Sequence, residues 1–296
     1  MRHTRTLCLA AAVTAATFGL AACGGATTGS TSKSAASAQS APPMASVADA
    51  MALVTKQSSA YTSMKMTMTE VVPKTGTISS TGSLSTRPLA MDLTVSDPQF
   101  TQSLGTGSVR MLLSGDVMYM DMGAKGAQEL GGKQWMKLDL SSLGASGQAM
   151  SQMMNQSSAQ SPASTVQLLT SSGDIRRVGQ ETVDGVPTTH YTGVVDIKKL
   201  LTQETKGSSV GSAELKTLLS EQSGLGLTTE NVDLWVNAQN LPVRVHETAQ
   251  TSTGPLDVTV DYSDFSTAPL TPVLPPASDT VDYSQLLKQE QQSQAG

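Results

Sequence analysis

Cysteine, histidine and aromatic residues are all scarce in this sequence of 296 residues. It contains two cysteines, Cys8 and Cys23, three histidines and only 10 aromatic side chains. Cys8 lies in an N-terminal apolar stretch of the kind that is cleaved off. A chain left with one cysteine forms no internal disulfide and no thiolate zinc site. We therefore expect neither, and we expect no catalytic thiol.

Basic residues are also few. The chain has 19 lysines and arginines against 24 acidic residues. Removal of the first 22 residues takes away Arg2 and Arg5 and no acid, which leaves 17 basic groups against 24 acidic ones and a net charge of −7. Nucleic-acid binding needs clustered lysines and arginines to neutralise phosphates. Nucleic acid is therefore not an expected partner.

Several motifs of enzymes and cofactor sites are missing. The sequence has no His-Glu-x-x-His, no Walker phosphate-binding loop and no Gly-x-Gly-x-x-Gly fingerprint. His190 and His246 lie on polar or mixed faces of predicted strands, and neither has the convergent ligands of a metal site. The abundant serines leave a serine–histidine–acid triad open as the weaker alternative. We predict a protein that is not an enzyme and that holds no cofactor and no metal.

The N-terminus carries the most specific signal. A basic start, Met1 to Arg5, precedes an apolar stretch and the tetrapeptide Leu20-Ala21-Ala22-Cys23. This resembles the lipobox of bacterial lipoproteins. The apolar stretch, at most about 17 residues, is short for a spanning helix, which needs roughly 20, so a retained anchor helix is the weaker alternative. The resemblance implies a signal peptide over residues 1–22 and a thioether-linked diacylglycerol on Cys23.

Residues 24–45 are rich in Gly, Ser, Thr, Ala and Gln and have no apolar period. Such a segment predicts a flexible tether, and about 22 residues of this kind span roughly 25 Å root-mean-square. This tether either holds the folded domain near the membrane or is a spacer whose length has no functional requirement. We predict a lipidated N-terminus and tether at 23–45, a folded domain at 46–270 and a Pro-rich C-terminal tail at 271–296.

Two apolar periods occur within the predicted domain. A helix is predicted from Ser46 to about Gln57, because Met51 and Val54 recur at helical spacing. Beyond it the period is two, which is typical of strands with one apolar face. Such strands are predicted at about 64–72, 77–84, 89–95, 109–113, 118–122, 136–140, 176–182, 188–196, 232–236, 243–245 and 256–262. Further helices are predicted within 144–172, at 197–206 and at 212–222.

The order of these elements predicts an α+β fold with a curved antiparallel sheet of about eleven strands. No strand–helix–strand rhythm of a parallel sheet occurs. Sheets of more than about ten strands twist and curl, so the apolar face becomes concave. Bulky aromatic residues are too few to fill such a face. We therefore expect helices to cover the concave face and to leave a cavity.

Short segments of the sequence resemble one family of lipoproteins. They are Asp184-Gly185-Val186-Pro187-Thr188-Thr189-His190-Tyr191, Asp233-Leu234-Trp235-Val236-Asn237, Leu241-Pro242-Val243-Arg244-Val245 and Asp261-Tyr262-Ser263-Asp264-Phe265. They are similar to those of the actinobacterial LppX/LprA/LprF/LprG lipoproteins over about residues 46–270. The resemblance implies a LolA-like half-barrel of eleven antiparallel strands with helices over the open face. It also implies binding or carriage of acylated lipids and glycolipids in the cell envelope.

Methionines and leucines of the first six strands are the predicted ligand-binding residues. Unbranched, polarizable methionine side chains adapt to ligands of irregular shape. The alternative is ordinary core packing beneath the covering helices. The predicted apolar wall comprises Met64, Met66, Met68, Met91, Leu93, Met111, Leu113, Met118, Met120, Met122, Met136 and Leu138.

The predicted function is that of a lipoprotein anchored through Cys23 to the extracytoplasmic face of the cell membrane. It would bind an amphiphilic lipid or glycolipid in a cavity between sheet and helices. The alternative is a non-enzymatic sensor or interaction protein with a closed core, which contacts an envelope protein through its polar sheet face. Trp235, Arg244 and Asp257 lie on that face.

Lipidation gives the first test. Because Cys23 is the only cysteine left after signal removal, we expect Cys23→Ser to block acylation and maturation. Metabolic labelling with a fatty-acid probe should then disappear, while Cys8→Ser should label normally. Persistent labelling of the Cys23→Ser chain would contradict the lipobox interpretation.

Overall fold

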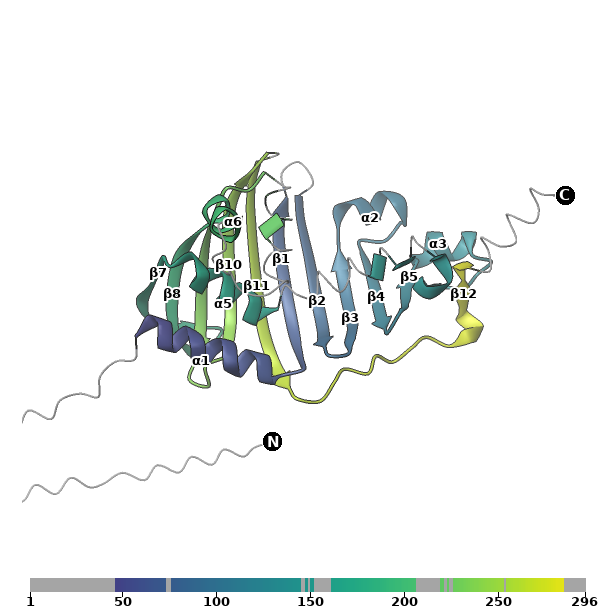
Figure 1. The fold of residues 1–296 in the computed structure, drawn as a ribbon. Helices are drawn as coiled ribbons and strands as arrows, with labels where there is room; N and C mark the ends of the chain where they lie inside the picture. Colours follow the sequence, from purple (N-terminus) through teal and green to yellow (C-terminus); the bar gives the residue numbers. More distant parts are fainter. Residues whose placement is uncertain are drawn as a thin grey trace, which may run out of the picture. The chain divides into compact units, whose positions relative to one another are not determined.

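The structure is a computed structural model, and it describes residues 46–72, 76–144, 147–148, 150–151, 161–205, 219–220, 223, 226–252 and 254–284 (Figure 1). Two units are distinguished, residues 1–44 and 45–296. All described residues belong to the second. The signal peptide, Cys23, the tether and most of the predicted helix at 212–222 lie outside the described residues.

One open sheet of twelve strands forms the second unit, in the order β12-β6-β5-β4-β3-β2-β1-β11-β10-β9-β8-β7. All neighbouring strands pair antiparallel except β12, which runs parallel to β6. The predicted fold class is confirmed, with one more strand than expected. The strands are β1 (Ser63–Val72), β2 (Gly76–Thr86), β3 (Leu89–Ser96), β4 (Ser108–Ser114), β5 (Val117–Asp121), β6 (Trp135–Asp139), β7 (Ile175–Val183), β8 (Val186–Asp196), β9 (Thr229–Asn237), β10 (Pro242–Thr251), β11 (Gly254–Ser266) and β12 (Thr280–Asp282).

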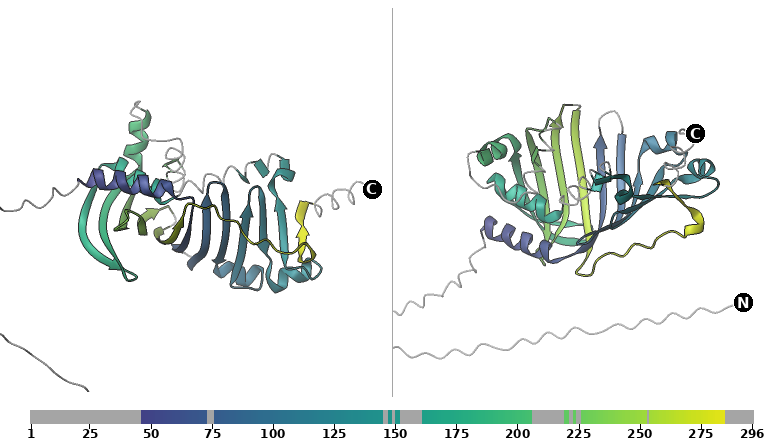
Figure 2. Two further views of the ribbon diagram at one scale, coloured as in Figure 1. Left: turned by 90° about the horizontal axis from the view of Figure 1, so that it is seen from below. Right: turned by 45° about the vertical axis from the view of Figure 1, so that its right-hand side comes forward.

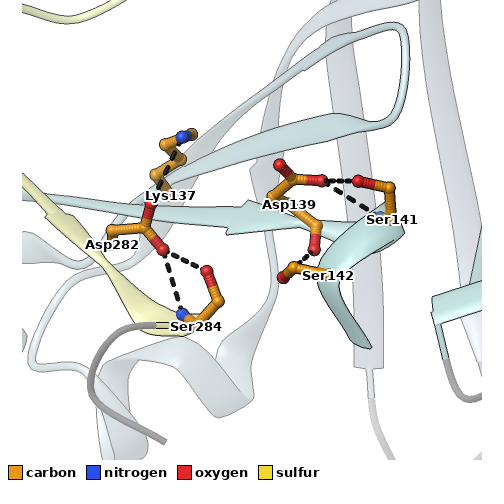
Figure 3. Close-up of polar contacts among 6 residues, drawn as sticks. All are labelled: Lys137, Asp139, Ser141, Ser142, Asp282 and Ser284. Atoms are coloured by element: carbon orange, nitrogen blue, oxygen red, sulfur yellow. Dashed lines mark hydrogen bonds and ion pairs between the residues drawn. The ribbon is translucent and has the colours of Figure 1, made fainter. Parts of the chain in front are cut away.

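The twelfth strand comes from the predicted C-terminal tail. Residues 267–276 lead from β11 to a 3₁₀ turn, η2 (Ala277–Asp279), and then to β12 at the far edge of the sheet (Figure 1). The Lys137 ammonium lies 3.2 Å from Asp282 Oδ2, and the other carboxylate oxygen, Oδ1, accepts hydrogen bonds from the Ser284 amide and hydroxyl (Figure 3). Sequence periodicity missed β12 because three residues are too few to show an alternation.

Helices α1 (Val47–Ala60), α5 (Pro162–Ser172) and α6 (Ile197–Thr205) agree with the predicted helices. A capping box between Ser46 and Asp49 begins α1, and the Ser161 hydroxyl caps α5 directly before Pro162. None of the helices that the structure describes is both long enough and apolar enough to span a membrane. Three short elements were not predicted: α2 (Pro98–Ser103), α3 (Gly123–Glu129) and η1 (Leu140–Leu143).

The larger apolar core lies between helices α1, α5 and α6 on one side and strands β8–β10 on the other. It contains Met51 and Val54 of α1, Leu169 of α5 and Leu200 of α6, each at most 1% exposed. They pack on alternate residues of the strands, such as Leu234, which is fully buried. We call the side of the sheet that carries this core the inner face and the opposite side the outer face. The left view of Figure 2 shows that the strands of this half are strongly curved.

A smaller core covers the other end of the inner face. Leu113, Met118 and Leu138 are buried there together with Leu140 of η1, and Met150 packs against them. Side chains of β11 pack against the larger core and side chains of β3 pack against the smaller one, so β1 and β2 separate the two cores along the sheet. The middle of the inner face therefore lies between two packed regions.

The predicted Asp-Gly hairpin is confirmed between β7 and β8. Asp184 and Gly185 both have positive φ, 49° and 82°, as a two-residue turn of the mirror-image type requires. Only small or turn-forming residues adopt this backbone readily, so the dipeptide fixes the register of the pair.

Gly193 of β8 provides a test of the larger core. A Cβ at this position would lie 2.1 Å from the Asp174 carbonyl oxygen and 2.7 Å from Leu169 Cδ1, because the end of α5 passes directly over the strand. We expect Gly193→Ala to lower the free energy of unfolding by about 1–3 kcal/mol in urea denaturation. Gly179→Ala on β7 is the control, since its Cβ would meet nothing within 4 Å. Equal stabilities of the two variants would contradict this packing.

Candidate functional site

Strand register places the inner-face side chains in rows that cross the sheet. Directly paired residues on neighbouring strands point to the same side. The first row, from β1 to β6, is Met64, Leu84, Met91, Leu113, Met118 and Leu138. The second row, from β11 to β12, is Tyr262, Met66, Gly82, Leu93, Met111, Met120, Met136 and Val281. The third row, from β8 to β4, is Tyr191, Leu234, Val245, Val260, Met68, Ser80, Val95 and Val109.

These rows contain eleven of the twelve predicted wall residues, all on the inner face. The exception is Met122, which lies beyond β5 and is the N-cap residue of α3. Its alternation with Met120 suggested a longer strand. The chain instead leaves the sheet at Asp121, whose carboxylate accepts a hydrogen bond from the Gly123 amide. Whether the eleven residues bind a ligand stays a prediction.

Burial separates the first row from the second. Met64, Leu113, Met118 and Leu138 are at most 8% exposed, so most of the first row is closed core. Every large apolar residue of the second row is only half-buried by the chain: Met66, Leu93, Met111, Met120, Met136, Tyr262 and Val281. The second row, together with the half-buried Met68 and Met91, is therefore the part of the predicted wall that a ligand could contact.

Strand β2 has small residues at the centre of this face. Gly82 stands in the second row and Ser80 in the third. A Cβ on Gly82 would lie 2.0 Å from the Asp92 carbonyl oxygen of β3, so the close approach of these two strands excludes any side chain there. The large side chains of β1 and β3 thus flank a strand with little bulk.

Three polar residues interrupt the inner face near the larger core. Glu230 of β9 is buried, and Glu247 of β10 and Tyr262 of β11 are half-buried. Burial first, and the neighbouring Glu230 second, raise the pKa of Glu247 from 4.5 to about 8. Burial first, and then Glu247, raise the pKa of the Tyr262 phenol. These surroundings therefore favour the protonated, uncharged form of the Glu247 carboxyl.

Two of the cavities whose lining the structure describes lie beside the apolar cores. The larger, of about 370 Å³, lies beside α6 and is lined by Lys198, Leu201, Thr202, Ser223, Gly226, Leu227 and Thr228. The smaller, of about 160 Å³, adjoins the smaller core beside Leu89, Leu113 and Leu140. Both are lined in part by residues of the apolar cores, but of these two only the smaller is lined by strand residues, Leu89 and Leu113.

The outer face carries a polar network that the sequence did not reveal. His190 Nδ1 lies 2.8 Å from Glu181 and its Nε2 lies 2.8 Å from Asp233. The Trp235 ring stacks on His190 at 4.4 Å, and its Nε1 donates to Glu181 at 2.7 Å. The Trp235 and His190 bonds both lower the pKa of Glu181. These residues come from β7, β8 and β9, so only the sheet register brings them together.

Two other outer-face residues named in the sequence analysis also have internal partners. Arg244 forms ion pairs with Asp261 and Asp184. Asp257 lies 3.1 Å from His246 Nε2.

Two observations bear on catalysis. Among the described residues, no group of three or more histidine, cysteine, aspartate and glutamate side chains is arranged to hold a metal. The pentapeptide at 207–211 has Gly-x-Ser-x-Gly spacing but lies outside the described residues. A nucleophile elbow follows a strand, whereas the element before this pentapeptide is helix α6. That context does not fit the elbow.

Sequence comparison finds relatives in Streptomyces. The chain is 39% identical over 192 residues to an uncharacterised 31.2 kDa protein of Streptomyces griseus, a match that covers 64% of this chain and 61% of the relative. It is 33% identical over 187 residues to a Streptomyces coelicolor protein whose name classes it provisionally as a lipoprotein, covering 62% and 54%. The matches thus span little more than half of each relative's length. No family model matches the chain.

Comparison of structures gives likenesses of low sequence identity. Mycobacterium tuberculosis LppX is 14% identical, with 76% of this chain and 96% of LppX covered and a TM-score of 0.44. LprF from Mycobacterium bovis is 13% identical, with 77% and 98% covered and a TM-score of 0.48. The predicted resemblance to LppX- and LprF-type lipoproteins is confirmed.

Glu247 gives a test by pH. Its folded-state pKa of about 8 exceeds the ordinary 4.5, so between these values the folded chain holds a proton that the unfolded chain releases. The free energy of unfolding should therefore fall as pH rises from 4.5 to 8, relative to Glu247→Gln. Denaturant titrations at several pH values measure this difference. Glu129→Gln, at an exposed position of α3, is the control, and equal pH slopes for wild type and Glu247→Gln would contradict the assignment.

Proposed function

We propose that this protein is a membrane-anchored, extracytoplasmic lipoprotein that binds an amphiphilic lipid against the inner face of its sheet. The observation that carries the proposal is the second row. Its large apolar side chains lie in one line across the sheet. Each remains half-buried, although Tyr262 packs against the larger core and Met111 and Met120 pack against the smaller one. Soluble domains rarely leave a long apolar surface uncovered unless something binds there.

The dimensions of the second row suit acyl chains. The row crosses eight strands, and at about 4.8 Å per strand spacing it is roughly 34 Å long. A bilayer core of roughly 30 Å holds two leaflets, so one acyl chain spans about 15 Å. One chain could therefore lie along part of the row while a second occupies the remainder.

The anchor supports the same proposal. The lipobox-like tetrapeptide ends at Cys23, and a relative with 33% identity is named as a lipoprotein. A tether of about 22 residues would keep the domain near the membrane from which a lipid is taken. The likeness to envelope lipoproteins also favours a binding role over an enzymatic one.

The alternative of a protein-interaction surface receives less support. Trp235, Arg244 and Asp257 were the residues expected to contact a partner. Each instead has a hydrogen-bond or ion-pair partner within the sheet. These contacts show that the three side chains stabilise the sheet, and they give no sign of a surface kept free for a partner.

A matched pair of bulky substitutions on β5 tests lipid binding. Met118 lies in the closed first row and Met120 in the half-buried second row. We expect Met118→Trp to overpack the smaller core and to lower the free energy of unfolding by about 1–3 kcal/mol. Met120→Trp should change it by less than about 0.5 kcal/mol, since the ring can project over the open row. It should also remove most of the bound lipid.

The experiment uses the full chain extracted in a mild non-ionic detergent. Thermal or urea melts report stability, and organic-solvent extraction followed by mass spectrometry reports lipid that is not covalently attached. Wild-type chain that never carries extractable lipid would overturn the proposal. So would a Met120→Trp variant that is as destabilised as Met118→Trp and keeps its lipid.

A further inference from the structure

The central part of the inner face contains two polar groups that form no hydrogen bond with the residues that the structure describes. We define the central patch as Met66, Met68, Val258, Val260, Glu247 and Tyr262. Register places all six on one face of β10, β11 and β1, with Glu247 opposite Val258 and Tyr262 opposite Met66. Within the described part of the chain, neither the Glu247 carboxyl nor the Tyr262 hydroxyl has a hydrogen-bond partner.

Both groups are deep in the protein and yet reachable. Burial is the main cause of the raised pKa of each. Both side chains are nevertheless only half-buried, as are the four apolar residues of the patch. An unpaired polar group in such surroundings costs free energy, and a ligand that pairs with it recovers that cost.

Hydrogen-bond chemistry narrows the class of ligand. A protonated carboxyl and a phenol each offer one O–H donor. Ester carbonyl oxygens are acceptors without charge, and they occur where acyl chains join the polar part of a lipid. With apolar side chains on either side, the two donors match the junction between acyl chains and an uncharged ester.

Charge argues against an anionic lipid at the same place. Glu70, Val258 and Glu247 lie in one row across β1, β11 and β10, directly next to the third row. Glu230 lies beside Glu247. The inner-face positions of β1, β9, β10 and β11 that the structure describes include no lysine or arginine. A phosphate placed over the patch would therefore face the Glu70 carboxylate without a balancing cation from these strands.

We propose that Glu247 and Tyr262 donate hydrogen bonds to the ester carbonyl oxygens of an uncharged acylated lipid, whose chains lie along the second row. Anionic phospholipids are disfavoured at this position. This inference rests on the proposed lipid-binding function and adds the class of ligand and the two residues that select it.

The test compares two probes with identical acyl chains. Dioleoylglycerol is an uncharged diester, and dioleoylphosphatidylglycerol carries an anionic phosphate. Both are titrated in non-ionic detergent into the full chain. We expect wild type to bind dioleoylglycerol more tightly than the anionic lipid.

Three variants separate hydrogen bonding from packing. Tyr262→Phe and Glu247→Leu each remove a donor and keep apolar bulk, so each should weaken dioleoylglycerol binding about two- to tenfold. Glu247→Gln keeps an N–H donor at the same place and should bind within about twofold of wild type. Thermal melts of each variant show that it is folded, and Tyr262→Phe alone still decides the matter if a Glu247 variant fails to fold.

The outcomes distinguish this inference from the proposed function. Dioleoylglycerol binding that is unchanged in Tyr262→Phe and Glu247→Leu would overturn the donor role and leave lipid binding intact. Tighter binding of the anionic lipid by wild type would overturn the selectivity. Wild type that binds neither probe, and carries no extractable lipid, would remove the proposed function together with this inference.

Discussion

The pairing of β1 with β11 is the contact on which the rest of the inner face depends. It joins two strands that lie far apart in the sequence, and it aligns Met66 with Tyr262 and Met68 with Val260. A slip of one residue would turn Lys65 and Thr67 toward the core and the methionines toward solvent. Because large apolar sets lie on both sides of this pair, burial selects the observed register strongly.

The two halves of the sheet bury their apolar faces in different ways. Helices α1, α5 and α6 cover β8–β10 with fully buried side chains such as Met51 and Leu169. The half formed by β3–β6 has a smaller cover from Leu140, Leu143 and Met150. The rows continue between these covers, so apolar side chains of β1, β3 and β11 stay half-buried. The proposed lipid-binding surface lies where the described cover is thinnest.

The outer face shows how a polar sheet surface can stabilise itself. His190 is held between Glu181 and Asp233 and is only 12% exposed, beneath the Trp235 ring. Surface ion pairs contribute little singly, but shared partners fix several side chains at once. The network spans β7, β8 and β9, and it ties the edge strand to the sheet. Its residues are occupied by structure rather than available for a partner.

Sequence periodicity alone determined the strands, their apolar face and the Asp184-Gly185 turn, because each is encoded by neighbouring residues. The eleven wall residues on one face followed from alternation by two. Met122 was misplaced because alternation cannot show where a strand leaves its sheet. β12 was missed because its three residues show no alternation of their own and form a strand only by pairing with β6.

Tertiary structure decided everything that depends on pairs far apart in the chain. Met118 and Met120 are equivalent by alternation, yet one lies in a closed core and the other in a half-buried row. Glu247 looks like an ordinary polar strand residue, and only its position opposite Val258 and beside Glu230 shows that it lies on the apolar face. The sequence determines which side of a strand is apolar, since that is local. Which apolar positions are covered is set by the packing of distant elements, and that packing exists only in the folded chain.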